Sequence, residues 1–136
     1  MIYREMLEIE TQKGVSFTNI TDRINEMLSR CVLKNGICNI FLTSTTSGLI
    51  LNEDERMLLG DLTRHYDQMA EEGRLYNHAS NAFAHIRATS AKQELTLPVS
   101  QGHLMLGQWQ SIILCEFDNE PRKRTLIVTM LTGGTA

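Results

Sequence analysis

The sequence predicts one α+β domain in which short strands alternate with two or three helices. The chain has 136 residues, a length that fits a single domain with a real hydrophobic core. Short runs with strand-like alternation or clustered β-branched residues recur along the chain. Two further stretches carry apolar residues at helical spacing. Because no linker, repeat or low-complexity tract interrupts the pattern, we expect residues 1–136 to form one domain.

The amino-terminal part predicts a strand, a helix and a second strand. Residues 2–10 alternate in polarity, with Tyr3, Glu5, Leu7 and Ile9 on one side. After a turn at 11–14, Thr18 or Asn19 can cap a helix, whose apolar positions are Ile20, Ile24, Met27, Leu28 and Cys31. Asn35-Gly36 breaks that pattern, and the β-branched and aromatic residues of 37–42 indicate a buried strand.

The remaining chain predicts two helices and three strands. A helix follows the acidic run 52–55 and shows its apolar face at Met57, Leu58, Leu62, His65, Tyr66 and Met69. A short helix over 82–90 is expected after Asn81, a favourable N-cap residue. Strands are expected at 94–99, 111–117 and 125–131, with a glycine-containing segment at 103–110 between the first two.

Composition excludes several classes of function. A net charge of −3 and a pI near 5.8 provide no basic footprint for nucleic acid. No basic leader and no apolar run of about 18 residues occurs, so no membrane association is expected. The odd number and wide spacing of Cys31, Cys38 and Cys115 fit reduced thiols in a cytoplasmic protein.

The segment 76–87 holds the strongest candidate for a site. His78 and His85 are seven residues apart, so on one straight helix they would be displaced by roughly 10 Å along the axis. One zinc ion needs both ring nitrogens about 2.0–2.1 Å away. If both bind one ion, His78 must therefore lie in a loop and His85 on the short helix. The alternative is a surface loop histidine beside a partly buried one.

Two other stretches could contact phosphate. Residues 43–53 contain five hydroxyl side chains, which together with backbone amides can receive phosphate oxygens; the alternative is an ordinary turn rich in serine and threonine. The trio Arg122, Lys123 and Arg124 could grip a phosphate, or could be a solvated hairpin end. Asp61 is either a boundary residue of its helix or a carboxylate aimed into a cleft.

The order and spacing of several motifs resemble the YjbQ-like family. From about Gly36 to near the carboxyl end, the matching residues are Gly48-Leu49-Ile50-Leu51-Asn52-Glu53, Tyr76-x-His78, Ala84-His85-Ile86-Arg87-Ala88, Pro98-Val99-x-x-Gly102-x-Leu104-x-Leu106-Gly107-x-Trp109-Gln110, Glu116-Phe117-Asp118 and Pro121-Arg122-x-Arg124. The resemblance implies a cytosolic, often trimeric α+β protein built on a β-sandwich of mainly antiparallel strands. It also implies a secondary thiamine-phosphate synthase activity, which joins hydroxymethylpyrimidine diphosphate to thiazole phosphate and releases pyrophosphate.

The chain departs from the family at one position of its site. The family's site resembles a cluster of three histidines, of which two match His78 and His85. The position of the first falls on Ser44, within Ser44-Thr45-Thr46-Ser47. Serine is a poor zinc ligand beside imidazole, and His103 lies where the family usually has arginine or a similar residue. A site with two histidines would need water, a carboxylate or substrate oxygens to complete a metal ion's coordination.

These observations define one enzymatic hypothesis and two alternatives. For a synthase that binds a small phosphorylated molecule and a divalent metal ion, zinc or magnesium, the candidate catalytic residues are His78, His85, Asp61 and Glu53. The candidate metal ligands are His78 and His85, and the candidate binding residues are Ser44, Thr45, Thr46, Asn52, Arg87, Arg122 and Arg124. The alternatives are a homotrimeric ligand-binding protein without catalysis and a metal-dependent phosphohydrolase. Cys115 is expected to be a core residue because it lies in an apolar strand.

Overall fold

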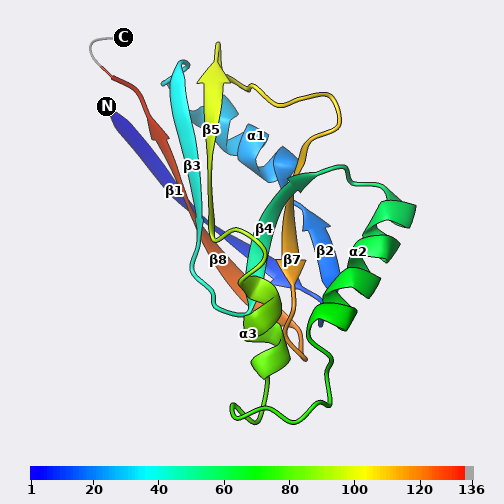
Figure 1. The fold of residues 1–136 in the computed structure, drawn as a ribbon. Helices are drawn as coiled ribbons and strands as arrows, with labels where there is room; N and C mark the ends of the chain where they lie inside the picture. Colours follow the sequence, from blue (N-terminus) through cyan, green and yellow to red (C-terminus); the bar gives the residue numbers. More distant parts are fainter. Residues whose placement is uncertain (134–136) are drawn as a thin grey trace.

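Two antiparallel sheets and three helices make up the described part of the chain, which confirms the predicted α+β class (Figure 1). The computed structural model describes residues 1–133. Its strands are β1 (Ile2–Thr11), β2 (Ser16–Asn19), β3 (Gly36–Leu42), β4 (Ser47–Asn52), β5 (Glu94–Ser100), β6 (His103–Leu104), β7 (Ser111–Glu116) and β8 (Arg122–Leu131). Its helices are α1 (Thr21–Arg30), α2 (Arg56–Met69) and α3 (Ala82–Ala88).

The larger sheet has the strand order β1-β8-β3-β5-β6. Alternation decides which side chains face inward: Leu7 and Ile9 of β1 are buried, whereas their neighbours Met6 and Glu8 are exposed. The same alternation continues along β5, where Leu95, Leu97 and Val99 are the buried positions. One face of this sheet therefore forms the core and the other remains at the surface.

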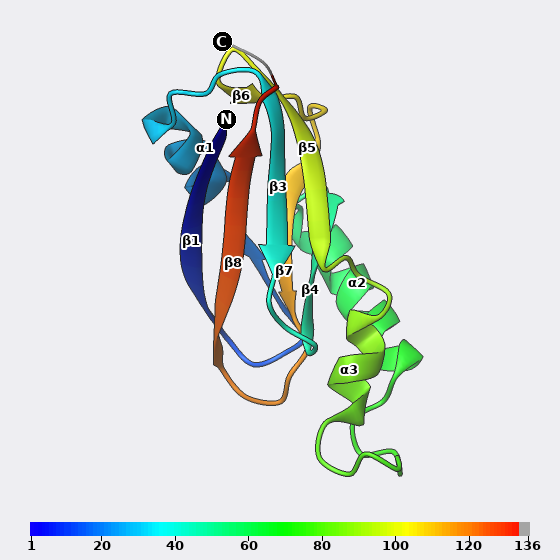
Figure 2. The ribbon, with the colours of Figure 1, turned by 90° about the vertical axis from the view of Figure 1, so that its left-hand side faces the viewer.

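The smaller sheet, β2-β7-β4, is covered on both faces. Ile112 and Leu114 of β7 pack in the main core between the sheets, whereas Ile113 and Cys115 pack against α2 and α3 together with Phe117. A strand buried on both sides needs apolar residues at consecutive positions, which explains the continuous apolar run of this segment. Figure 2 shows α2 and α3 on the far side of β4 and β7 from the larger sheet.

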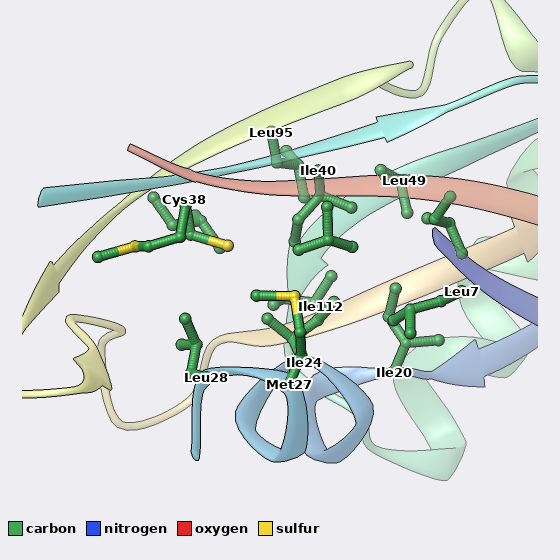
Figure 3. Close-up of a cluster of buried hydrophobic side chains, with 14 of the residues drawn as sticks. Leu7, Ile20, Ile24, Met27, Leu28, Cys38, Ile40, Leu49, Leu95 and Ile112 are labelled. Atoms are coloured by element: carbon green, nitrogen blue, oxygen red, sulfur yellow. The ribbon is translucent and has the colours of Figure 1, made fainter. Parts of the chain in front are cut away.

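Helix α1 closes the main core (Figure 3). Ile24 and Met27 are fully buried, and their side chains point from α1 toward the strands. The predicted cap at Thr18 or Asn19 is wrong: the N-cap residue of α1 is Ile20, which makes no side-chain capping hydrogen bond, although Asn19 Oδ1 accepts a hydrogen bond from the backbone N–H of Thr21 at 3.0 Å. Among the helices of residues 1–133, none combines the length and apolar composition needed to cross a bilayer.

The structure corrects three expectations about local structure. The stretch 43–53, expected to be a loop, contains β4, and the four-residue strand β2 was not expected. Helix α3 ends at Ala88 rather than at Ser90. Gly48 shows why β4 forms despite its polar surroundings: a Cβ at this position would lie 2.3 Å from Cβ of Ala91, so glycine permits the close approach of the segment after α3.

Candidate functional site

His78 and His85 lie together, and α3, which carries His85, lies at the end of the molecule opposite the start of β1 (Figure 1). His85 is half-buried on α3, and His78 is exposed in the loop that precedes this helix. The centroids of the two rings are 4.9 Å apart and the ring planes are perpendicular. The loop thus removes the axial separation that a single helix would impose on residues seven positions apart.

Asn81 connects His78 to the interior. Asn81 is the N-cap residue of α3, but its side chain makes no capping hydrogen bond. Its Oδ1 lies 3.1 Å from Nε2 of His78, and its Nδ2 donates to Oδ1 of Asp118 at 3.2 Å. Asp118 is buried and also accepts a hydrogen bond from Arg122 Nε at 3.0 Å. Burial alone would raise the pKa of Asp118, but the Asn119 amide, Asn81 and the charge of Arg122 hold the pKa below its ordinary value.

The first hollow beside the histidines is mainly apolar. It has a volume of about 360 Å³ and is lined by Tyr76, Asn77, His78, Ala82, His85 and Ile86. Ile86 is exposed although it is large and apolar. An aromatic ring, an aliphatic side chain and two imidazoles around one concavity suit a small planar ligand, with few polar groups to fix its orientation.

A second hollow starts on the other side of His85. It has a volume of about 350 Å³ and is lined by Ser44, Thr45, His85, Ala88, Thr89, Ala91 and Gln93. His85 therefore borders both hollows, and the structure brings Ser44 into the same concavity as one of the two histidines. A third hollow of about 510 Å³ continues from Ser44 and Thr45 to Thr46, Gln93 and Arg124.

The hydroxyl of Ser44 is arranged to donate a hydrogen bond outward. Its Oγ accepts from the backbone N–H of Thr46 at 3.1 Å and from the hydroxyl of Ser47 at 2.6 Å. Ser47 is fully buried and has no other acceptor within residues 1–133, so its hydrogen must point to Ser44. Both acceptor positions of Ser44 are then occupied. Its own hydrogen is left for an acceptor in the hollow, such as a phosphate oxygen.

Gln93 contributes a buried acceptor beside this turn. Its Nε2 donates to the carbonyl of Ser47 at 3.0 Å, and its Oε1 is the only buried side-chain oxygen or nitrogen without a hydrogen-bond partner among residues 1–133. A buried acceptor without a donor is costly. Gln93 was not among the predicted site residues, and its place is set by β5 pairing with β3, which sequence patterns do not reveal.

Arg124 reaches the hydroxyl-rich turn, but most of its donors are already used. Its Nε donates to Oε1 of Glu116 at 2.7 Å, and its Nη2 donates to Oγ1 of Thr46 at 2.7 Å and to the second oxygen of Glu116. Glu116 is fully buried and also accepts a hydrogen bond from Thr11 Oγ1 at 2.7 Å. Within the described chain Nη1 makes no hydrogen bond, so this nitrogen remains for a ligand in the third hollow.

The other predicted arginines lie in different surroundings. Arg122 forms ion pairs with Asp118 and Glu120, so its charge is largely compensated. The side chain of Arg87, a residue of α3, is buried, and its Nε and Nη2 donate to the carbonyl of Ala70 at 3.0 and 2.8 Å. Desolvation lowers the pKa of Arg87, an effect that the nearby Asp67 opposes. Arg87 thus connects α3 to the C-cap residue of α2 by hydrogen bonds. It does not line the hollows that contain the histidines or Ser44.

Two other predicted site residues, Asn52 and Glu53, lie at the opposite end of β4 from the hydroxyl-rich turn. Ser47 is paired with Glu116 and Asn52 with Ser111, so Asn52 and Glu53 lie one strand length, roughly 16 Å, from the hydroxyl-rich turn. The side chain of Asn52 accepts a hydrogen bond from the backbone N–H of Glu53. Asp61 is exposed on α2 and pairs with Arg64. Within one chain, the structure does not bring these three residues to the histidines.

The two imidazoles do not make a complete metal site by themselves. Among residues 1–133, no group of three or more histidine, cysteine, aspartate or glutamate side chains is placed to hold an ion. A catalytic zinc site commonly has three protein ligands. His78 and His85 could hold an ion only if water or the ligand's oxygens supplied the rest of its coordination.

The buried cysteines are not candidates for catalysis. Cys31, Cys38 and Cys115 are buried and form no disulfide among the described residues. Burial raises the pKa of Cys115 to about 12, and burial together with the nearby Cys31 raises the pKa of Cys38 to about 11. Such thiols hold little thiolate at neutral pH, so Cys115 is a core residue, as its apolar strand indicated.

Sequence comparisons connect nearly the whole chain with one group of proteins. A profile described as UPF0047 protein YjbQ-like matches residues 5–133. A UPF0047 protein from Archaeoglobus fulgidus is 38% identical over 129 residues, which cover 92% of this chain and 98% of that protein. The UPF0047 protein YugU from Bacillus subtilis is 31% identical over 128 residues, which cover 92% of this chain and 96% of that protein.

Solved structures with the same fold support this connection. A YbjQ-like protein of unknown function from Sulfolobus solfataricus superposes with a TM-score of 0.87 and 30% identity, covering 98% of this chain and 100% of that one. A YjbQ/UPF0047 protein from Clostridium acetobutylicum superposes with a TM-score of 0.81 and 26% identity, covering 92% of this chain and 99% of that one. The similarity therefore extends over both sheets and all three helices.

Proposed function

Because the chain belongs to the UPF0047 YjbQ-like family, we propose that it binds a small phosphorylated heterocycle and acts as a thiamine-phosphate synthase. The observation that carries the proposal is the position of His85, which borders both the apolar hollow and the hollow that contains Ser44. A ligand with a ring at one end and phosphate at the other matches this pair of hollows.

The apolar hollow is suited to the ring. Tyr76 and Ile86 offer flat and aliphatic surfaces, and Ala82 leaves room between them. Its volume of about 360 Å³ lies at the lower end of the range of small-molecule sites. Burial of a heterocycle there would supply affinity, while the two imidazoles would supply the directional contacts.

The hydroxyl-rich turn is suited to the diphosphate. Ser44 offers a hydroxyl hydrogen, Thr45 offers a further exposed hydroxyl, and Arg124 offers Nη1. Ser44 is held in place by Ser47, and Arg124 by Thr46 and Glu116, so little reorganisation of these two donors is needed when charge develops on a leaving phosphate. Donors preorganised toward developing negative charge are the main way in which such a site lowers a barrier.

The proposed reaction needs stabilisation of the negative charge on the leaving pyrophosphate, and it needs no nucleophilic side chain. The bond between the pyrimidine methylene carbon and the diphosphate oxygen breaks, and its electron pair leaves with pyrophosphate. The thiazole ring nitrogen donates its own pair to the same carbon and forms the new carbon–nitrogen bond. Ser44 and Arg124 would stabilise the departing oxygens, and His85 would hold the methylene end between the hollows. His78 and His85 would hold a divalent ion, which would supply further neutralisation of charge, and no step of this mechanism depends on it.

The proposal includes a homotrimer with the site near a subunit boundary. Two rows of large apolar side chains lie on the outer face of the larger sheet: Ile2 and Ile37 flank Leu131, and Met6 lies in the row of Phe41. Their exposed fractions run from 40% for Ile37 to 66% for Met6. Phe41 also lines the hollow next to Arg124. A second copy that covered this face would therefore close one side of the site.

A ligand-binding protein without catalysis is the second candidate. Two observations favour it: Ser44 stands where the family's site has a histidine, and residues 1–133 supply only two imidazoles for an ion. A protein that kept the hollows but lost one metal ligand would still bind the phosphorylated heterocycle. The cytoplasmic location that the resemblance implies fits either function and stays a prediction.

Incubation of the purified protein with both precursors and magnesium would distinguish the candidates. Formation of thiamine phosphate supports the synthase, release of inorganic phosphate alone supports the phosphohydrolase, and calorimetric binding of hydroxymethylpyrimidine diphosphate without turnover supports the binding protein. The variant Ser44→Ala removes the outward hydroxyl and should reduce turnover. His103→Ala is the matched control, because His103 is exposed in β6 and lines a separate hollow with Lys34. If the protein formed no product and bound neither precursor, the proposal would be refuted.

A further inference from the structure

We propose that Asn81 is a positioning residue that holds neutral His78 in the tautomer with hydrogen on Nε2, so that the Nδ1 lone pair faces the ligand. The inference rests on the proposed function only in treating His78 as a ligand contact. The partner of His78 is then a metal ion or a hydrogen-bond donor of the ligand, and the phosphate oxygens contact Ser44 instead.

The carboxylate of Asp118 determines which way the side-chain amide of Asn81 points. Its terminal group lies 3.2 Å from Oδ1 of Asp118, a carboxylate that is ionised at neutral pH. An ionised carboxylate only accepts hydrogen bonds. The group that faces Asp118 must therefore be the NH₂ of Asn81, and the carbonyl oxygen must point the other way, toward His78.

The amide direction in turn determines the tautomer of His78. Oδ1 of Asn81 lies 3.1 Å from Nε2 of His78, and an amide oxygen has no hydrogen to donate. A hydrogen bond at this distance therefore requires the hydrogen on Nε2. The other tautomer would place two lone pairs against each other. Ser80 Oγ donates to the same oxygen at 3.3 Å and strengthens its role as an acceptor.

Asp118 anchors this chain of hydrogen bonds to the core. Besides Asn81, Asp118 accepts hydrogen bonds from the backbone N–H of Asn119 at 2.8 Å and from Arg122 Nε at 3.0 Å. It has an exposed fraction of 2%. The buried carboxylate of Asp118 thus orients the exposed His78 through the side-chain amide of Asn81. The amide transmits orientation without placing a negative charge beside the imidazole, unlike a direct carboxylate–histidine pair.

This arrangement decides what His78 can recognise. With Nε2 occupied, the neutral ring offers a lone pair at Nδ1 and no free N–H, so it cannot donate to a phosphate oxygen. A metal ion or an N–H group of the ligand is the matching partner. Ser44 has the opposite character, because both of its acceptor positions are occupied and only its hydrogen is available. His78 therefore accepts a hydrogen bond or binds a metal ion, whereas Ser44 donates a hydrogen bond.

Nitrogen-15 NMR of the full chain at pH 8.5, where imidazole is neutral, tests the tautomer directly. We expect the wild type to show His78 with a protonated Nε2 only, and Asn81→Leu to show a mixture of both tautomers. Asn77→Leu is the matched control, since Asn77 is exposed, lines the same hollow and makes no side-chain hydrogen bond within residues 1–133. A tautomer mixture in the wild type, or an unchanged tautomer in Asn81→Leu, would overturn the proposal.

Titration with zinc alone and with inorganic pyrophosphate tests the recognition that follows. Asn81→Leu should weaken zinc binding by roughly tenfold or more, as loss of a supporting hydrogen bond to a ligating histidine commonly does, and should leave pyrophosphate affinity within twofold. Ser44→Ala should show the reverse pattern. If Asn81→Leu weakened pyrophosphate as much as zinc, His78 would be a phosphate donor and the assignment would be wrong. Failure of the synthase assay would leave these results intact, so the two proposals can fail separately.

Discussion

Replacement of Arg124 by methionine should strongly destabilise the protein, because it leaves a buried carboxylate without its counter-charge. Glu116 is fully buried, and Arg124 contacts both of its oxygens. After the substitution, Thr11 Oγ1 and the backbone N–H of Asp118 are the donors that Glu116 keeps within residues 1–133. Loss of one partner of a buried ion pair typically costs about 3–5 kcal/mol. We expect a loss within this range at pH 7, with a further contribution from Thr46, which also loses its guanidinium partner.

A second substitution should restore part of the lost stability. In Glu116→Gln/Arg124→Met the buried charge is gone, while the amide oxygen of the glutamine can accept from the backbone N–H of Asp118 and its NH₂ can donate to Thr11 Oγ1, whose own hydrogen can turn to the carbonyl of Arg122. The double variant should therefore unfold at a higher urea concentration than Arg124→Met alone. The difference measures how much of the cost comes from the uncompensated charge rather than from lost packing.

Urea unfolding followed by far-ultraviolet circular dichroism, at one fixed protein concentration, is the assay. Lys123→Met is the control, because Lys123 lies in the same strand and its ammonium is 3.9 Å from Glu8 in an exposed pair. Exposed pairs contribute at most about 1 kcal/mol. If Arg124→Met lost no more than Lys123→Met, or if the double variant were no more stable than the single one, the ion pair would not have the role derived from its burial.

Four further outcomes are expected. His85→Ala should weaken zinc and pyrophosphate binding more than His103→Ala in calorimetric titrations, since only His85 borders the two hollows; equal losses would contradict the assignment. Ser44→His should tighten zinc binding at least tenfold, about 1.4 kcal/mol, and a normally folded variant with unchanged affinity would show that position 44 does not face the histidines. Light scattering should give a trimer for the wild type and a smaller species for Met6→Glu, whereas a monomeric wild type would refute the assembly. Burial opposes ionisation of Asp118, but its hydrogen bonds and ion pair keep the folded-state pKa below the ordinary value. Its stabilising contribution is therefore complete above about pH 4 and is lost as the pH falls through the folded pKa; acid unfolding of Asp118→Asn should lack this component.

The elements with clear periodicity were predictable from the sequence, and those that depend on a neighbour were not. The spacing of Ile20, Ile24 and Met27 defines the buried face of α1, and the apolar run of β7 reflects burial on both faces. Strand β4 was missed because Ser47 and Gly48 have low intrinsic strand preference. They form a strand because β7 pairs with them and because Ala91 packs on Gly48, which are contacts between segments far apart in the sequence.

The sequence indicated where the two histidines of the candidate site lie, but it did not indicate that the nearby arginines are paired with buried carboxylates. Helix geometry requires His78 to lie in a loop if both histidines bind one ion, and the structure has His78 in the loop before α3. The pairing of Arg124 with Glu116 depends on the connection between β7 and β8, which passes from the smaller sheet to the larger one and brings residues eight positions apart together. Such contacts depend on how the two sheets pack together, so the sequence could indicate a basic cluster without indicating that it is already neutralised.

The pairing of these arginines has a kinetic consequence for any anionic ligand. Arg122 and Arg124 are matched by Asp118 and Glu116, so these four side chains add no net charge to the mouth of the site. The long-range field that would draw a diphosphate from solution is therefore weak, and few encounters are steered. The association rate should depend little on ionic strength. Selectivity for the phosphorylated ligand would then arise after contact, in the lifetime of the complex rather than in the speed of its formation.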